Sequence, residues 1–229
     1  MNGGLMEIST GQEAQGRNRG GMMPGSLLVG WAIPSFLYAL LAVSKVTQAF
    51  DSQRFSARLF LVLSAALWVM FLVFTQRRRA PLRRNRAVGS VVAALGAAVV
   101  GALFGLTGVT EHSGRLVVAD IFLLTGLAFS IFAAAYLGRC FGVMADARGL
   151  VTGGPYQLVR HPLYLGEIVT MSGMVVGSQK VVLALIALVL IVALQVTRAG
   201  FEEQTIAAAF PEYASYAQRV RYRIVPKLY

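Results

Sequence analysis

The chain has 229 residues, of which 56% are hydrophobic and only 14% are charged. Soluble domains carry about 25% charged residues, so this composition excludes an ordinary soluble domain and favours a chain that buries most of its surface in lipid. The formal net charge of +11 points to a nucleic-acid partner only until the positions of the basic residues are considered. A single cysteine, Cys140, excludes an intrachain disulfide and a thiolate metal cluster. The two histidines, His112 and His161, fall on opposite expected sides of a membrane, which does not favour a histidine zinc site.

Six apolar runs follow one another along the chain, and a helix that spans a bilayer needs roughly 20 mostly apolar residues. These runs are Ser26–Val46, Leu59–Thr75, Ala87–Val109, Leu116–Gly138, Leu163–Gly177 and Val181–Val196. The first four meet the length requirement. The last two are short and closely spaced, so they form either two tilted spans or a hairpin that enters the membrane and returns. The predicted fold class is an all-α integral membrane protein, a bundle of five or six transmembrane helices.

The basic residues predict the orientation of this bundle. Most of the 21 lie in alternate segments, namely the N-terminal segment, the loop 76–86, the loop 139–162 and the C-terminal tail. The positive-inside rule places these segments, and both termini, in the cytosol; a bacterial inner membrane is the expected location. The basic residues also suit the anionic headgroups of membrane lipids. No basic face interleaved with aromatic residues accompanies them, which argues against a nucleic-acid partner.

By composition the chain divides into three parts. Residues 1–25 are polar and rich in glycine, and we expect a disordered cytosolic tail. Residues 26–138 predict a transmembrane scaffold of four helices. Residues 139–229 concentrate His, Tyr, Glu and Arg in an otherwise apolar sequence, and we expect them to form the cofactor-binding and catalytic region, with a helical hairpin and an amphipathic tail.

The first chemistry-bearing segment is 149–166. Gly153–Pro155 predicts a turn. Pro162 suits the first turn of a helix, which places His161 at the N-cap and Tyr164 one turn inside. An imidazole, a phenol and unpaired backbone N–H groups then face the cytosolic interface. They form either a binding site or a belt of interfacial anchors.

The second such segment is Arg198, Glu202 and Glu203, at the cytosolic end of the last apolar run. Arg198 and Glu202 are four residues apart and share a helix face, whereas Glu203 is rotated away by roughly 140°. The pair is either a surface ion pair worth about 0.3–0.5 kcal/mol, or a functional pair, because polar groups near lipid are costly. Glu167, one turn beyond Tyr164, either pairs with Arg198 or caps the cavity.

The third is the tail from Phe210 to Pro226. Tyr213, Tyr216 and Val220 recur at a spacing of three to four residues, giving one apolar and one basic helix face. We expect a membrane-surface helix that folds over the site.

At these three segments the sequence resembles the isoprenylcysteine carboxyl methyltransferase family and its phospholipid-methyltransferase-like bacterial relatives. The shared pattern is G-x-Y-x-x-x-R-H-P-x-Y-x-G, then R-x-x-x-E-E, then a Phe and an x-E-Y-x-x-Y tail that ends in Pro. It is carried here by Gly154, Tyr156, Arg160, His161, Pro162, Tyr164, Gly166, Arg198, Glu202, Glu203, Phe210, Glu212, Tyr213, Tyr216 and Pro226. The resemblance covers roughly residues 141–226. The tail lacks the usual Gly after Phe210 and is one residue shorter, which weakens inferences about the substrate.

The resemblance implies a membrane enzyme that binds S-adenosylmethionine in a cytosol-facing pocket, without a Rossmann domain. It assigns to the cofactor Leu150, Val151, Tyr156, His161, Pro162, Tyr164 and Glu202. Arg198 and Glu202 would be catalytic, and Arg198 and Glu167 would face the acceptor. A sulfonium is cationic, so aromatic faces and a nearby carboxylate suit it. An arginine fork suits a carboxylate acceptor.

The sequence leaves the methyl acceptor open. An isoprenylcysteine-type carboxylate is the first expectation, and a phospholipid amine (phosphatidylethanolamine) or a small thiol, deprotonated with help from His161 or Glu202, are alternatives. A non-enzymatic transporter or assembly factor is a hypothesis of another class. A transporter predicts interrupted helices paired in two halves, whereas this chain concentrates its chemistry at one end, which favours the enzyme. The oligomeric state stays open.

Overall fold

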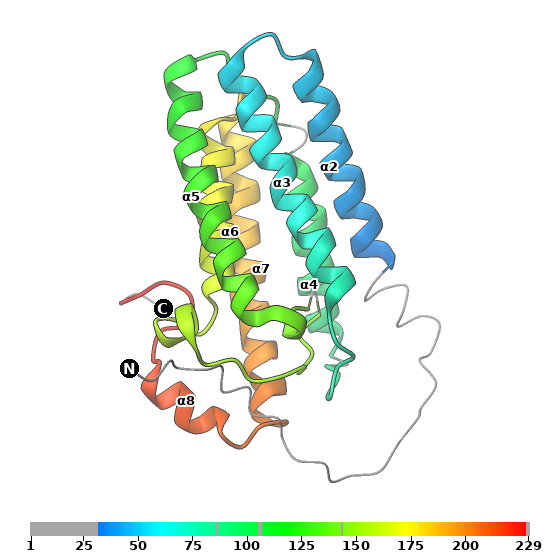
Figure 1. Cartoon of the computed structure of the whole chain (residues 1–229), viewed down its shortest axis with the longest axis vertical. Helices are drawn as coiled ribbons and strands as arrows, with labels where there is room; N and C mark the ends of the chain where they lie inside the picture. Colours follow the sequence, from blue (N-terminus) through cyan, green and yellow to red (C-terminus); the bar gives the residue numbers. More distant parts are fainter. Residues whose placement is uncertain (1–31, 86, 105–106, 143, 228–229) are drawn as a thin grey trace, which may run out of the picture.

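The computed structural model describes residues 32–85, 87–104, 107–142 and 144–227. These residues form a bundle of long helices with short connections (Figure 1). In chain order the elements are α2 (Ile33–Asp51), α3 (Phe55–Arg77), α4 (Val88–Leu103), α5 (Ser113–Leu137), the 3₁₀ turns η3 (Gly138–Cys140) and η4 (Gly154–Gln157), α6 (Pro162–Val176), α7 (Val181–Ala207) and α8 (Tyr213–Arg219). The predicted disordered tail, residues 1–25, lies outside the described residues, as does the start of the first apolar run.

The predicted fold class is confirmed, because each of the six apolar runs contains a helix. Among the described residues, four helices are long and apolar enough to cross a membrane: α2, α3, α5 extended by η3, and α7. The chain is therefore an integral membrane protein. Many side chains on the outside of the bundle are apolar and exposed, among them Phe36, Val182 and Val189, as expected for a surface in contact with lipid.

The helix lengths differ from the expectation in two places. We expected Ala87–Val109 to span and Val181–Val196 to be short, yet α4 has 16 residues and α7 has 27. Helix α4 ends at Leu103; further on, Gly108 takes a left-handed conformation, with φ of 67°, and Val109 pairs with Ser178 in the α6–α7 turn. Helix α7 continues beyond its apolar run because Arg, Glu, Gln and Ala are good helix formers. The extra turns of α7 carry Arg198, Glu202 and Glu203.

Helix α6 is held closely against α5. Gly166 on α6 faces Gly126 and Ser130 on α5, where a Cβ atom would collide with the neighbouring backbone and hydroxyl. Such contacts between small residues allow close helix approach in membranes. At the far end of the bundle, Arg115 donates to the carbonyl oxygens of Val176 at 2.7 Å and Ser178 at 2.8 Å. Helix α6 is thereby fixed at both ends.

At the opposite end, the arginine-rich loop after α3 pairs with the loop after α5. The Leu82 N–H donates to the Ala147 carbonyl at 2.8 Å, and the Ala147 N–H donates to the Arg83 carbonyl at 2.9 Å. Arg148 Nε donates to the Arg79 carbonyl at 3.0 Å. The arginines that predicted membrane orientation therefore also support the loop that follows α5. Helix α8 and the C-terminal residues lie at this same end, beside the extension of α7 (Figure 1).

Candidate active site

The entrance of α6 has the predicted arrangement. Pro162 occupies its first turn, and His161 is the N-cap residue with its side chain free of any capping hydrogen bond. The His161 imidazole instead stacks on the Tyr164 ring, with centroids 5.1 Å apart and planes 7° apart. The backbone N–H of His161 donates to the Arg223 carbonyl at 2.7 Å. The stacked pair is therefore held at the mouth of the helix by the C-terminal tail.

The extension of α7 brings Arg198 and Glu202 to this stacked pair. The Tyr164 hydroxyl donates to Glu202 Oε2 at 2.6 Å, and the Arg198 guanidinium lies 5.0 Å from the centre of the Tyr164 ring. Arg198 also donates to the Gly142 carbonyl at 2.5 Å. The structure therefore brings together His161, Tyr164, Arg198 and Glu202, which the family resemblance assigned to one site, and Arg198 is buried instead of lying in a surface ion pair.

Glu203 belongs to the second segment and to the family pattern, but the sequence assigned it no role at the site, whose pocket it lines. Its carboxylate accepts from Arg160 Nε at 2.8 Å, from Arg223 Nε at 3.1 Å, and lies 3.2 Å from His161 Nε2. It thus joins α7, the entrance of α6 and the C-terminal tail. The rotation of Glu203 away from Arg198 on the helix could have indicated this role. Glu202 faces Tyr164 and Arg198, whereas Glu203 faces Arg160, His161 and Arg223.

The tail closes the site from the other side. Tyr213, Tyr216 and Val220 are buried in a cluster with Leu150 and Phe210. The predicted apolar face is therefore present, but it packs on the loop after α5 and belongs to a helix of only seven residues. The structure thus uses this face as a cover over the site, and not chiefly as a membrane-surface anchor.

The turn before α6 requires glycine at position 154 and is held by a hydrogen bond from Tyr216. Gly154 has φ of 58°, the left-handed region, and a Cβ there would collide with the Tyr136 ring. The Tyr216 hydroxyl donates to the Tyr156 carbonyl at 2.7 Å. Burial raises the pKa of Tyr156, Tyr213 and Tyr216 above the ordinary tyrosine value, so these phenols stay neutral at physiological pH.

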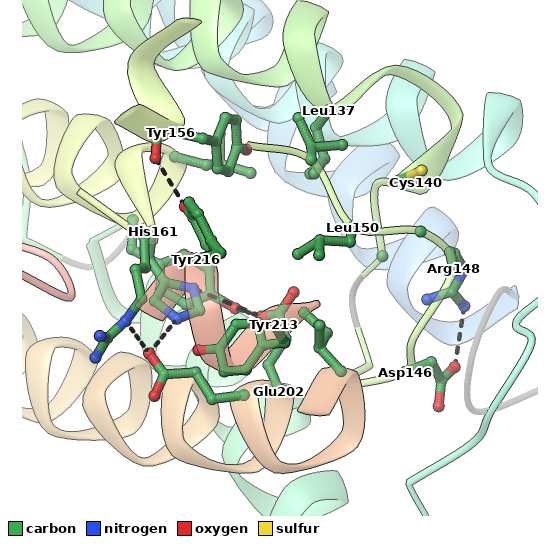
Figure 2. A pocket seen from close by; sticks show the side chains of 18 of the residues that line it. Leu137, Cys140, Asp146, Arg148, Leu150, Tyr156, His161, Glu202, Tyr213 and Tyr216 are labelled. Atoms are coloured by element: carbon green, nitrogen blue, oxygen red, sulfur yellow. Dashed lines mark hydrogen bonds and ion pairs between the residues drawn. The ribbon is translucent and has the colours of Figure 1, made fainter. Parts of the chain in front are cut away.

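These elements enclose a pocket with an empty volume of about 680 Å³, which we call the outer pocket (Figure 2). Its lining includes seven of the predicted site residues: Leu150, Val151, Tyr156, His161, Tyr164, Arg198 and Glu202. Pro162 is buried at the start of α6 and is not part of the lining, so its contribution is to position His161. Glu167 lines a separate cavity further along α6, which we call the inner cavity and whose lining includes Trp68, Gln195 and Arg198.

Arg148 and Asp146 are further lining residues that the sequence did not predict. They form a salt bridge of 3.0 Å at one side of the outer pocket (Figure 2). Burial lowers the pKa of Arg148, and the Asp146 carboxylate opposes that effect. Arg148 Nη1 is buried and has no hydrogen-bond partner among the described residues. The pocket thus offers an unused donor to an anionic group as well as aromatic faces and Glu202 for a cationic one.

The hydrogen bond from the Tyr216 hydroxyl to the Tyr156 carbonyl gives a first test of how the C-terminal tail is held over the pocket. Tyr216→Phe should lower stability by about 1–3 kcal/mol, because the buried Tyr156 carbonyl loses its donor. Thermal unfolding in detergent should show a midpoint several degrees lower, given about 2–4 °C per kcal/mol for a chain of this length. Tyr222→Phe is the matched control, because that side chain is 39% exposed. Equal midpoints for the two variants would show that the Tyr216 bond does not hold the cover.

The fold and the site define a helical membrane protein with an aromatic and charged ligand pocket at one end of its bundle. Residues 114–213 match the family model of phospholipid methyltransferases, which confirms the resemblance predicted from the motifs. The matched segment runs from α5 to the first residue of α8 and contains most of the pocket. The chain is also similar to the cobalt-zinc-cadmium resistance protein CzcN of Cupriavidus metallidurans, with 33% identity over 70 residues. That alignment covers 31% of this chain and 32% of the relative.

Proposed function

We propose that this protein is a membrane methyltransferase that uses S-adenosylmethionine to methylate a lipophilic acceptor. The observation that carries the proposal is the convergence of His161, Tyr164, Arg198 and Glu202 on one pocket at the end of the bundle. These four residues come from two helices that lie within the segment matched to the phospholipid methyltransferase family. Among the described residues no group of three metal-binding side chains occurs.

The charged and aromatic residues of the outer pocket support S-adenosylmethionine as its ligand. The stacked rings of His161 and Tyr164 provide aromatic faces, and Glu202 provides a carboxylate, for a cationic ligand. The unpartnered Arg148 Nη1 suits the carboxylate of an amino acid moiety. Leu150, Val151 and Tyr156 offer apolar walls. The bound molecule would supply an electrophilic methyl group.

The chain's own contribution is orientation and exclusion of water. Tyr164 holds the Glu202 carboxylate through a 2.6 Å hydrogen bond, and Arg198 is fixed by the Gly142 carbonyl and the Tyr164 ring. The tail residues Tyr213 and Tyr216 cover the pocket. Methyl transfer to a nucleophile is accelerated mainly by such positioning, which keeps the reacting atoms aligned at about 3–3.5 Å.

The acceptor would reach the site from the bilayer and the methyl donor from the cytosol. Arg198, as a guanidinium fork, supports an isoprenylcysteine-type carboxylate acceptor, and a phosphatidylethanolamine amine or a thiol are the other candidates within this class. The arginine-rich loop, placed at the same end as the outer pocket, supports a cytosolic orientation of this end in a bacterial inner membrane.

Loss of the stacked pair should weaken cofactor binding. His161→Ala removes one ring of the stack, and Tyr164→Phe keeps the ring but removes the hydroxyl that holds Glu202. We expect each to raise the dissociation constant for S-adenosylmethionine about tenfold, which corresponds to about 1.4 kcal/mol. Calorimetric titration of detergent-purified protein measures this directly. His112→Ala is the matched control, since His112 is the N-cap of α5 at the opposite end of the bundle. Unchanged affinity in both site variants would contradict the placement of the cofactor.

The activity itself is tested with methyl-labelled S-adenosylmethionine and purified protein reconstituted in bacterial lipid. The proposal predicts label in an organic-extractable product, dependent on protein and blocked by S-adenosylhomocysteine. The control is protein with His161→Ala, which should transfer label more slowly at limiting cofactor. Absence of protein-dependent label in lipid, volatile and peptide fractions alike, with folded protein, would contradict the methyltransferase assignment.

A further inference from the structure

The arginine-rich loop between α3 and α4, residues 78–85, does not line the outer pocket. It also lies outside residues 114–213, the segment matched to the family model, so the family likeness assigns it no function. The loop carries Arg78, Arg79, Arg83 and Arg84 and no acidic residue. This charge and the contacts of the loop therefore need an explanation of their own.

Several of these arginines lack partners in the protein. The Arg79 and Arg84 side chains are exposed, and they make no hydrogen bond or ion pair with a described residue. Arg78 Nη1 is buried and also has no hydrogen-bond partner among the described residues. Burial lowers the pKa of Arg78 to about 10, and the charges of Arg148 and Arg84 act in the same direction, against Asp146. Since a desolvated cation is stable only beside an opposite charge, the loop has positive charge left for an anionic partner.

The position of the loop identifies that partner. Helix α3 is long and apolar enough to span and ends at Arg77, so the loop begins where the chain leaves the bilayer. Leu82 in the loop and Val88 at the start of α4 are 72% and 77% exposed. Segments that combine exposed apolar side chains with basic ones lie on anionic membranes, the apolar groups at the acyl boundary and the cations on phosphates. Because a soluble anion would leave Leu82 and Val88 uncovered, the loop fits an anionic membrane lipid.

The loop also holds one wall of the outer pocket, the segment 146–151. The Arg79 carbonyl accepts from Arg148 Nε at 3.0 Å. The Asn85 N–H donates to Asp146 Oδ1 at 3.1 Å, and the other oxygen of this carboxylate accepts from Arg148. Two residues of the loop thus hold the two members of the salt bridge that lines the pocket.

The same loop holds a second wall, the extension of α7. Asn85 Nδ2 donates to Thr205 Oγ1 at 2.9 Å and to the Phe201 carbonyl at 3.3 Å. Both partners flank Glu202, whose carboxylate lines the pocket. Asn85 itself is not part of the lining. It is therefore a positioning residue, because it joins the wall of Arg148 to the wall of Glu202.

We propose that the arginine-rich loop binds the phosphate of an anionic membrane lipid, and that this contact raises the affinity of the outer pocket for its ligand. The inference rests on the proposed function and adds its regulation by the membrane. A lipid phosphate neutralises guanidinium groups that otherwise repel one another, and it thereby holds the loop against the two walls that Asn85 joins. The two sites are distinct, so each ligand strengthens the binding of the other by the same factor.

Titration in lipid discs of two compositions tests this coupling. The full chain is placed in phosphatidylcholine alone or with added phosphatidylglycerol, and is titrated calorimetrically with S-adenosylmethionine and with S-adenosylhomocysteine. We expect both dissociation constants to fall about tenfold with phosphatidylglycerol, within the usual range of coupling between two sites. S-adenosylhomocysteine lacks the sulfonium charge, so its response excludes mere accumulation of a cation at an anionic surface. Equal affinities in the two lipids would overturn the inference.

Inorganic phosphate, added to the phosphatidylcholine discs at matched ionic strength, separates a lipid headgroup from a free phosphate. It should leave the affinity unchanged. An increase equal to that with phosphatidylglycerol would make a soluble phosphate the occupant and overturn the lipid assignment. Absence of ligand binding in both lipids would overturn the proposed function instead. The thermal midpoint then still tests the lipid contact: phosphatidylglycerol should raise it, and an unchanged midpoint would exclude the contact.

A pair of loop substitutions tests whether the arginines carry the response. Arg79→Gln combined with Arg84→Gln should abolish most of the effect of phosphatidylglycerol on both affinity and midpoint. The matched control combines Arg219→Gln with Arg221→Gln, which removes two exposed charges from the tail at the same end of the bundle. We expect this control to keep the tenfold response. Equal losses in the two double variants would mean that net charge, and not the loop, is responsible.

Asn85→Ala tests the path from the lipid to the pocket. The variant keeps the loop arginines and the backbone N–H that donates to Asp146, but it loses the bonds to Thr205 and Phe201. We expect phosphatidylglycerol still to raise its midpoint, whereas its ligand affinity no longer responds to the lipid. A merely structural defect would lower the affinity and leave the ratio between the two lipids unchanged, and that result would overturn the coupling through Asn85. If Asn85→Ala does not fold, the two double variants decide.

Discussion

Arg198→Ala is expected to reduce methyl transfer about 10²–10³-fold, the usual cost of removing one positioned electrostatic group from a reaction centre. Arg198 lines both the outer pocket and the inner cavity. Its loss would leave Glu167 and Glu202 without the cation between them and would open a path for water from one space to the other. Binding of S-adenosylmethionine should change far less, because the stacked rings and Arg148 remain.

Two further variants test whether the effect is specific to the Arg198 guanidinium. Arg198→Lys keeps the charge but loses the fork that reaches the Gly142 carbonyl, so an intermediate rate is expected. Arg221→Ala removes an exposed arginine from the tail and should transfer methyl groups at the unmodified rate. Turnover assays and calorimetry on the same preparations measure the rate of methyl transfer and the affinity for S-adenosylmethionine. Unimpaired turnover in Arg198→Ala would remove this residue from the reaction centre, and a parallel loss of cofactor affinity would assign it to the cofactor instead.

Glu203→Gln is the substitution expected to destabilise the site most. The Glu203 carboxylate accepts from Arg160 and Arg223 and contacts His161, and its side chain is only 11% exposed. Removing one member of a buried charge network costs about 3–5 kcal/mol, because the remaining charges lose their partner. The lower end of that range applies here, since the Arg223 side chain is 35% exposed. The tail should detach from the entrance of α6.

Thermal unfolding and limited proteolysis measure this loss. We expect a lower midpoint and faster cleavage between α7 and the C-terminus, with weaker binding of S-adenosylmethionine because Tyr213 and Tyr216 no longer cover the pocket. Glu212→Gln removes a carboxylate of the same tail that is exposed to solvent, and it should behave like the unmodified protein. Equal midpoints and equal cleavage rates for the two variants would mean that Glu203 does not anchor the tail.

The apolar runs and the turn chemistry were enough to predict the helices and the entrance of α6. His161 and Pro162 fall at the positions that capping preferences assign to them. The length of α7 was underestimated because a hydropathy window ends at Arg198, whereas helix propensity does not. An apolar run thus predicts the part of a helix that lies in the membrane better than it predicts the last residue of the helix.

The partners of buried charges were harder to predict. Glu203 meets Arg160 and Arg223 across 43 and 20 residues of sequence, which no local spacing indicates. The inner cavity was missed for the same reason. Trp68 and Gln195 look like ordinary membrane residues in their own helices, and only tertiary packing places them in one cavity lining with Arg198 and Glu167.

The central claim is that the outer pocket binds a methyl donor, and calorimetric titration of the purified, folded full chain with S-adenosylmethionine tests it most directly. We expect one saturable site, weakened in His161→Ala, preserved in His112→Ala, and competed by S-adenosylhomocysteine. A flat titration from protein whose folding is verified by a cooperative thermal transition would contradict the methyltransferase account.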